Sequence, residues 1–131
     1  AAAVAVRNIE ILLEEQLPER AATMGAYLME GLKDRLFRHA ITGDIRGKGL
    51  LIGIELVTDR ESKVQLENSL VGGVVEFCKN RGVIVGRSGG GARHSNTIVL
   101  SPPLVITRGE CDTLIEVLDG ALEDAGEKVR R

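Results

Sequence analysis

The first 39 residues place apolar and charged side chains at the spacing of two amphipathic helices. In residues 2–16 apolar side chains recur every three to four positions and charged ones lie opposite, which predicts a helix. Pro18 interrupts this helix and suits the first turn of a second one. The expected buried row of the second helix is Met24, Leu28, Leu32 and Leu36.

After His39 the pattern changes to glycines, β-branched residues and alternation, which is typical of strands. Two strands are expected at about 42–46 and 50–57, joined through Gly47-Lys48-Gly49. The stretches "VIVGR" and "TIVLS", residues 83–87 and 97–101, predict two more strands on either side of a glycine-rich loop.

Two further helices complete the pattern. Apolar positions from Leu70 to Cys78 predict a helix, with Gly82 placed as its C-terminal cap. Pro102-Pro103 ends the last strand, because proline cannot donate to a ladder. A capping box, Thr107-x-x-Glu110, then starts the last helix. The expected core stripe of that helix is Cys111, Leu114, Leu118 and Leu122.

The resulting order, α-α-β-β-α-β-β-α, favours an α+β fold. The economical arrangement is a small, three- to four-stranded, mainly antiparallel sheet with helices packed on one face. At 131 residues the chain suits one domain.

The net charge argues against some classes of binding partner, and the cysteine content indicates the redox compartment. The net charge of −2 gives no bulk attraction to nucleic acid or to an anionic membrane. No apolar run approaches the ~20 residues that span a bilayer. Cys78 and Cys111 have neither metal-ligand spacing nor a disulfide framework, so we expect buried free thiols in a reducing, cytoplasmic setting.

Most candidate motifs have a simpler interpretation. "GKGLLIG" precedes a strand instead of opening a helix, which favours a turn over a nucleotide site. The stretch "GRSGGGARHSN", residues 86–96, with its loop at 88–96, could offer backbone N–H groups to an anion, although a flexible hairpin loop is favoured. His39 is expected at the surface near a helix end, and His94 in a loop without a partner, so no metal site is expected.

Arginine offers the one candidate binding group. Arg87 stands where a strand runs into the glycine-rich loop, and its guanidinium could grip a substrate carboxylate with two hydrogen bonds. Arg93 is the alternative, and Arg46 is expected in a structural ion pair or carbonyl contact. No catalytic or cofactor-binding residue is expected. The lysines are assigned to helix surfaces, a turn or polar loops: Lys33, Lys48, Lys63, Lys79 and Lys128.

Three stretches, in order, resemble the C-terminal small domain of class III aminotransferases of the ω-amino acid type. They are "ITGDIRGKGLLIGIELVTD", "FCKNRGVIVGR" and "NTIVLSPPLVITRGECDTLIEVLDGAL". The opening "AAAVAVRNIEILLEEQLPERA" also resembles the helix that links the family's large domain to its small one. The resemblance implies a linking helix at 1–16 and a small domain at 17–131.

The resemblance, rather than the residue pattern, supplies a chemistry. Family members use pyridoxal phosphate, held by a lysine of the large domain, to pass an amino group from an ω-amino acid, amine or diamine to a keto acid such as pyruvate. The match implies a homodimeric parent enzyme, a fragment that is inactive and binds no cofactor, and a carboxylate-binding role for Arg87. The alternative is a self-standing ligand-sensing or dimerising α+β module, which the abrupt helical start disfavours.

Overall fold

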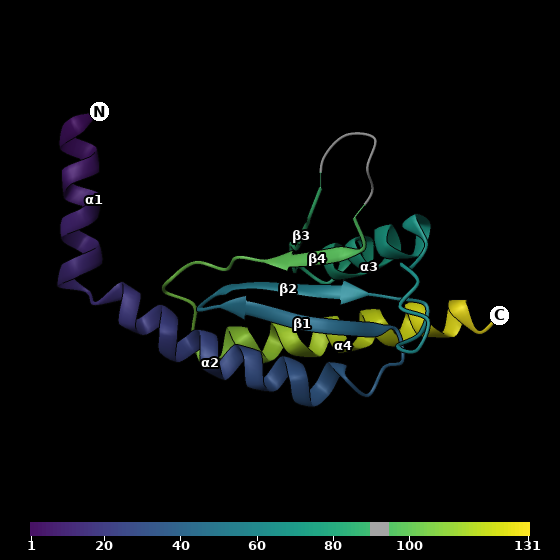
Figure 1. Ribbon diagram of the computed structural model, residues 1–131. Coiled ribbons are helices and arrows are strands. Elements are labelled where there is room, and N and C mark those ends of the chain that lie inside the picture. Colours follow the sequence, from purple (N-terminus) through teal and green to yellow (C-terminus); the bar gives the residue numbers. More distant parts are fainter. Residues whose placement is uncertain (90–94) are drawn as a thin grey trace.

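The computed structural model describes residues 1–89 and 95–131, which form four helices and a four-stranded sheet (Figure 1). In chain order these elements are α1 (Ala2–Glu14), α2 (Leu17–Leu36), β1 (Thr42–Lys48), β2 (Leu51–Leu56), α3 (Asn68–Asn80), β3 (Gly86–Arg87), β4 (Thr97–Leu100) and α4 (Arg108–Val129).

The sheet is antiparallel throughout, with the strand order β1-β2-β4-β3. Alternate side chains of the two central strands are buried on the side that carries the helices, because successive strand residues project to opposite faces. Figure 1 shows α2 and α4 side by side beneath the sheet. The expected α+β fold is confirmed, with α2, α3 and α4 packed on one face of the sheet. The buried apolar residues of the sheet are Ile45, Ile52, Ile54, Leu56, Ile98 and Leu100.

The β1–β2 hairpin turns later than the sequence suggested. Gly47 and Lys48 belong to β1, and the turn itself is Gly49-Leu50, with Gly49 at a φ of 56°. A side chain on Gly25 of α2 would collide with the backbone of Gly49. Glycine at position 25 therefore lets the helix approach the hairpin closely.

Both predicted helix caps are present. At the end of α3, the N–H of Val83 bonds to the Cys78 carbonyl at 3.0 Å, around Gly82 at a φ of 77°. At the start of α4, the Glu110 N–H donates to Thr107 Oγ1 at 3.2 Å, and the Thr107 N–H donates to Glu110 Oε2 at 2.8 Å.

Two packing details differ from expectation. In α4, Ile115 is buried in place of Leu114, which is half-buried. The strand expected over 83–87 pairs only at Gly86–Arg87, because β4 ends at Leu100 and the chain then leads into the two prolines.

Helix α1 stands apart from the rest of the fold (Figure 1). It has no buried residue, although the predicted amphipathic helix is present. Val6, Ile9 and Leu13, from its expected apolar stripe, are all more than half exposed, at 56%, 56% and 70%. Within the described residues, no helix is both long enough and apolar enough to cross a membrane.

Candidate functional site

The β3–β4 hairpin positions Arg87, the candidate carboxylate-binding residue. Arg87 lies opposite Ile98, and Gly86 lies opposite Val99. Directly opposed residues of an antiparallel pair share a face. The register therefore places Arg87 on the helix-bearing side at the free edge of the sheet, while Gly86 shares the open side with Val99.

The base of the hairpin holds the Arg87 side chain. Arg87 is half-buried, and its Nε donates to the Ser95 carbonyl at 2.6 Å. The Ser88 N–H continues the ladder by donating to the Thr97 carbonyl at 2.9 Å. Arg93 and His94 lie outside the described residues, as does most of the glycine-rich loop.

Asn96, next to Ser95, was assigned to the polar loop by its sequence context, but the structure buries it to 5% exposure. Its side-chain Nδ2 donates to the Leu56 carbonyl at 2.5 Å, and its carbonyl accepts from the Leu56 N–H at 2.9 Å. Asn96 therefore fastens the start of β4 to the end of β2. The asparagine gave no sequence signal, because polar residues are expected in a loop.

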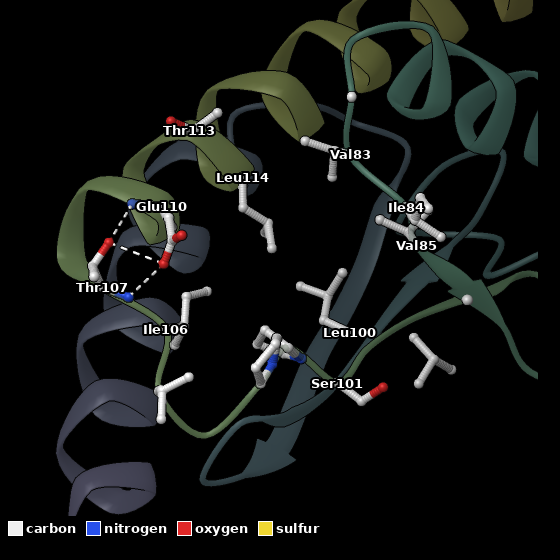
Figure 2. Close-up of a pocket in the computed structure, with 16 residues that line it drawn as sticks. Val83, Ile84, Val85, Leu100, Ser101, Ile106, Thr107, Glu110, Thr113 and Leu114 are labelled. Carbon is white, nitrogen blue, oxygen red and sulfur yellow. Dashed lines mark hydrogen bonds between the residues drawn. The ribbon is translucent and has the colours of Figure 1, made fainter.

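An open apolar groove with a volume of about 720 Å³ lies beside the hairpin (Figure 2). Its walls are the segment 82–86, the Pro-Pro corner and the first turns of α4. Leu114 lines this groove, which accounts for its departure from the expected core stripe. Gly86 reaches the groove, whereas Arg87 is not among its lining residues.

Arg46 is held in a structural ion pair, as expected. Its Nη1 lies 2.9 Å from Asp44 Oδ2 and 2.8 Å from Glu55 Oε2. Hydrogen bonds to Asp44 and then Glu55 raise the pKa of the Arg46 guanidinium. The two carboxylates occupy Arg46, so it is a poor candidate for binding a substrate carboxylate.

His39 lies in an ionic cluster around the buried Asp119, and its expected place at the surface is wrong. Its side chain is 12% exposed, and its Nε2 lies 2.7 Å from Oδ1 of Asp119, a residue of α4 that is 6% exposed. Arg35 and Arg38, near the end of α2, donate to the same carboxylate at 2.6–3.0 Å. Burial alone would raise the pKa of Asp119, but hydrogen bonds from His39, Arg35 and Arg38 outweigh it and lower that pKa.

Among the described residues, no lysine is placed to hold pyridoxal phosphate as a Schiff base. A lysine that forms a Schiff base is activated by desolvation or by a neighbouring cation. All five lysines are exposed: Lys33, Lys48, Lys63, Lys79 and Lys128. Across residues 1–89 and 95–131, the structure also holds no group of three or more His, Cys, Asp or Glu residues arranged for a metal ion.

The chain is similar to known aminotransferases along nearly its whole length. It is 38% identical over 127 residues to the taurine–pyruvate aminotransferase of Bilophila wadsworthia, covering 96% of this chain and 28% of that protein. It is 37% identical over 122 residues to the mitochondrial alanine–glyoxylate aminotransferase 2 of Homo sapiens, covering 93% of this chain and 23% of that protein. The chain thus spans only about a quarter of the length of these relatives.

Solved structures show the same similarity along this chain and the same partial coverage of the longer protein. An aminotransferase from Bacillus anthracis superposes with a TM-score of 0.89 at 46% identity, over 93% of this chain and 27% of that one. An (S)-enantioselective ω-transaminase from Thermomicrobium roseum superposes with a TM-score of 0.81 at 43% identity, over 94% of this chain and 26% of that one. The family model described as aminotransferase class-III matches residues 1–122. The chain therefore belongs to the class III aminotransferase family.

Proposed function

We propose that these residues serve as the small-domain part of a larger pyridoxal-phosphate-dependent aminotransferase. That enzyme would pass an amino group from an ω-amino acid, amine or diamine to a keto acid such as pyruvate. One observation carries this proposal: more than nine-tenths of the chain superposes on solved transaminases, yet it spans about a quarter of their length. A self-standing sensing or dimerising module does not account for this pattern of coverage.

Packing supports the proposed division of the chain. Residues 1–16 would form the helix that links a large domain to the small domain at 17–131. The α1 helix has no buried residue, and Gln16 takes a left-handed backbone conformation immediately before α2. A helix with an exposed apolar stripe requires a partner surface. A large domain would supply that surface.

Within this arrangement, Arg87 would bind the substrate carboxylate. The Arg87 side chain lies at the base of the β3–β4 hairpin. The hydrogen bond from its Nε to the Ser95 carbonyl already orients the guanidinium. Pyridoxal phosphate would be held by residues outside this chain, because all five lysines here are exposed. When bound, that cofactor supplies the electron sink for amino transfer, and this chain's part is to orient the substrate.

The assembly would be a cytoplasmic homodimer. Cys78 and Cys111 are both buried and unpaired, which suits a reducing compartment. The apolar groove beside the hairpin and the stripe on α1 leave aliphatic surface for contact with other parts of the enzyme.

Arg87→Ala in the transaminase that contains this chain tests the proposal. Loss of a partly buried ion pair should weaken keto-acid binding by about 2–5 kcal/mol, which raises the KM for pyruvate by at least about 30-fold. The KM for an amine donor that lacks a carboxylate should stay unchanged. Arg81→Ala is the matched control, because the Arg81 guanidinium lies 3.6 Å above the Phe77 ring on α3. An unchanged KM for pyruvate in Arg87→Ala would assign Arg87 a surface role only.

A second test uses the 131-residue chain itself. After incubation with pyridoxal phosphate and borohydride, intact mass should show no stoichiometric adduct at a single lysine. The five lysine amines are exposed, so pyridoxal phosphate should label them weakly and should not prefer any one of them. A single lysine labelled to completion would contradict the placement of the cofactor outside this chain.

A further inference from the structure

We propose that Asn96 is the positioning residue for Arg87. It fixes the Ser95 carbonyl, and that carbonyl in turn orients the Arg87 guanidinium. The functional meaning of this inference rests on the proposed carboxylate-binding role of Arg87. The structural relation between Asn96 and Arg87 is testable without any substrate.

The first step is the fastening of Asn96. It is 5% exposed and bonds to Leu56 twice, through its side-chain amide and through its main-chain carbonyl. The Leu56 carbonyl also accepts from the Leu66 N–H at 3.1 Å, so that part of the backbone is itself held in place. A buried residue that is hydrogen-bonded to one partner through both its side-chain amide and its carbonyl has little freedom to rotate.

The second step passes this constraint to Ser95. The Ser95 carbonyl and the Asn96 N–H belong to one peptide unit, and that unit is planar. Fixing the side chain and the carbonyl of Asn96 fixes the position of its backbone nitrogen, so rotation about the single N–Cα bond of Asn96 is what remains to move the Ser95 oxygen. The Ser95 side chain has a separate role, since its Oγ accepts from the Thr97 N–H at 3.2 Å.

The third step passes the constraint to Arg87. The Ser95 oxygen accepts from Arg87 Nε at 2.6 Å. A guanidinium is rigid and planar, so a bond at Nε restricts the direction in which the two terminal nitrogens project. These terminal nitrogens form the fork that suits a carboxylate. Asn96 thus acts on the candidate binding group through one peptide plane and one hydrogen bond.

The experiment measures the exchange rate of the Arg87 Nε–H with solvent by NMR in the 131-residue chain. The Arg87→Lys variant identifies the signal by its disappearance. Asn96→Asp keeps the shape of the side chain but replaces its donor with a carboxylate that faces the Leu56 carbonyl. We expect exchange at Arg87 Nε to accelerate by about tenfold when the hydrogen bond to a charged donor loosens.

Two controls separate positioning from general loosening of the fold. Thr42→Val removes another buried hydrogen bond from a side chain to the backbone, the 2.7 Å bond to the Leu36 carbonyl, and should leave the Arg87 signal unchanged. Ser95→Ala keeps the carbonyl and should also leave it nearly unchanged. Asn96→Ser replaces Asn96→Asp if the latter fails to fold. Equal exchange rates in the wild type and a folded Asn96 variant, or the same acceleration in Thr42→Val, would overturn the inference.

A kinetic measurement on the transaminase that contains this chain separates the inference from the proposed function. If Asn96→Asp accelerates exchange and also raises the KM for the keto acid without lowering kcat, both are supported. If exchange accelerates while neither Asn96→Asp nor Arg87→Ala changes that KM, Asn96 still positions Arg87, but the carboxylate-binding role of Arg87 is wrong. If exchange does not change, the inference fails whatever the kinetics show.

Discussion

Removal of the Asp119 charge should be among the most destabilising polar substitutions in this fold. The carboxylate is 6% exposed and accepts hydrogen bonds from Arg35, Arg38 and His39 at 2.6–3.0 Å. Asp119→Asn keeps the size of the side chain but replaces an acceptor oxygen with a donor group that faces other donors. The α2–α4 contact would lose its main ionic link.

The expected cost follows from the exposure of each partner. Removing one member of a buried ion pair costs about 3–5 kcal/mol when the remaining charge is stranded. Here Arg35 and Arg38 are 53% and 55% exposed, so water can solvate them after the substitution and each pair contributes little. The side chain of His39 is only 12% exposed, so the substitution leaves its Nε2 without a hydrogen-bond partner. We therefore expect Asp119→Asn to lower the free energy of unfolding by about 2–3 kcal/mol at pH 7, measured by urea denaturation.

The pH dependence provides an independent check. The pKa of Asp119 lies below its ordinary value of 3.8 in the folded protein, so the folded state holds the proton more weakly than the unfolded state does. The stabilisation is fully present above the unfolded pKa and is lost as pH falls through the folded one. The difference between wild type and Asp119→Asn should therefore shrink as pH falls below about pH 4.

A matched control lies one turn further along α4. Asp124 pairs with Lys128 at 2.6 Å, but both side chains are exposed, at 40% and 51%. Asp124→Asn should change the free energy of unfolding by less than about 0.5 kcal/mol. A loss of similar size in both variants, or a loss for Asp119→Asn that does not vary down to pH 2, would refute the reasoning.

Two further predictions use thermal or chemical unfolding as the readout, and a third uses thiol alkylation. Gly25→Ala should destabilise the fold by about 1–3 kcal/mol because its Cβ meets the Gly49 backbone, whereas Gly72→Ala in α3, with no atom within 4 Å of its Cβ, should stabilise it by about 0.5–1 kcal/mol. Thr107→Ala should cost about 1 kcal/mol through loss of the capping box, and Thr107→Ser should recover most of that loss. Burial raises the pKa of the Cys78 thiol to about 11, so alkylation at pH 8 should follow global unfolding, and rapid labelling under native conditions would contradict its burial.

Local patterns were enough to predict the elements of the fold. The period of apolar positions located the four helices of the described residues, because each carries its apolar side chains along one stripe, which α2, α3 and α4 bury. The Thr107–Glu110 box and Gly82 also marked their helix ends correctly, because caps depend on residues close in sequence. The extent of β3 could not be read in this way. Strand length depends on how far a partner strand continues, and β4 stops at Leu100.

The candidate site was less predictable than the fold. Arg87 could be selected because an arginine at a strand end next to a glycine-rich loop is a local feature. Asn96 could not, because its burial depends on Leu56, which lies 40 residues earlier in the chain. The proposed binding role of Arg87 also depends on groups that the proposed large domain would supply. Sequence reasoning selects Arg87 as the candidate but does not find the residues that hold it.

Asp119 and Asn96 share a physical role that an aliphatic core cannot fill. The chain is 2% aromatic, so its core consists mainly of Leu, Ile and Val side chains. Burial of such side chains is favourable but has no direction, and it restrains the sliding of α2 along α4 only weakly. The Asp119 hydrogen bonds have direction, and so do those of Asn96 between β2 and β4. Replacement of the Asp119 cluster with well-packed apolar residues should therefore retain much of the stability, while the α2–α4 contact becomes less uniquely defined.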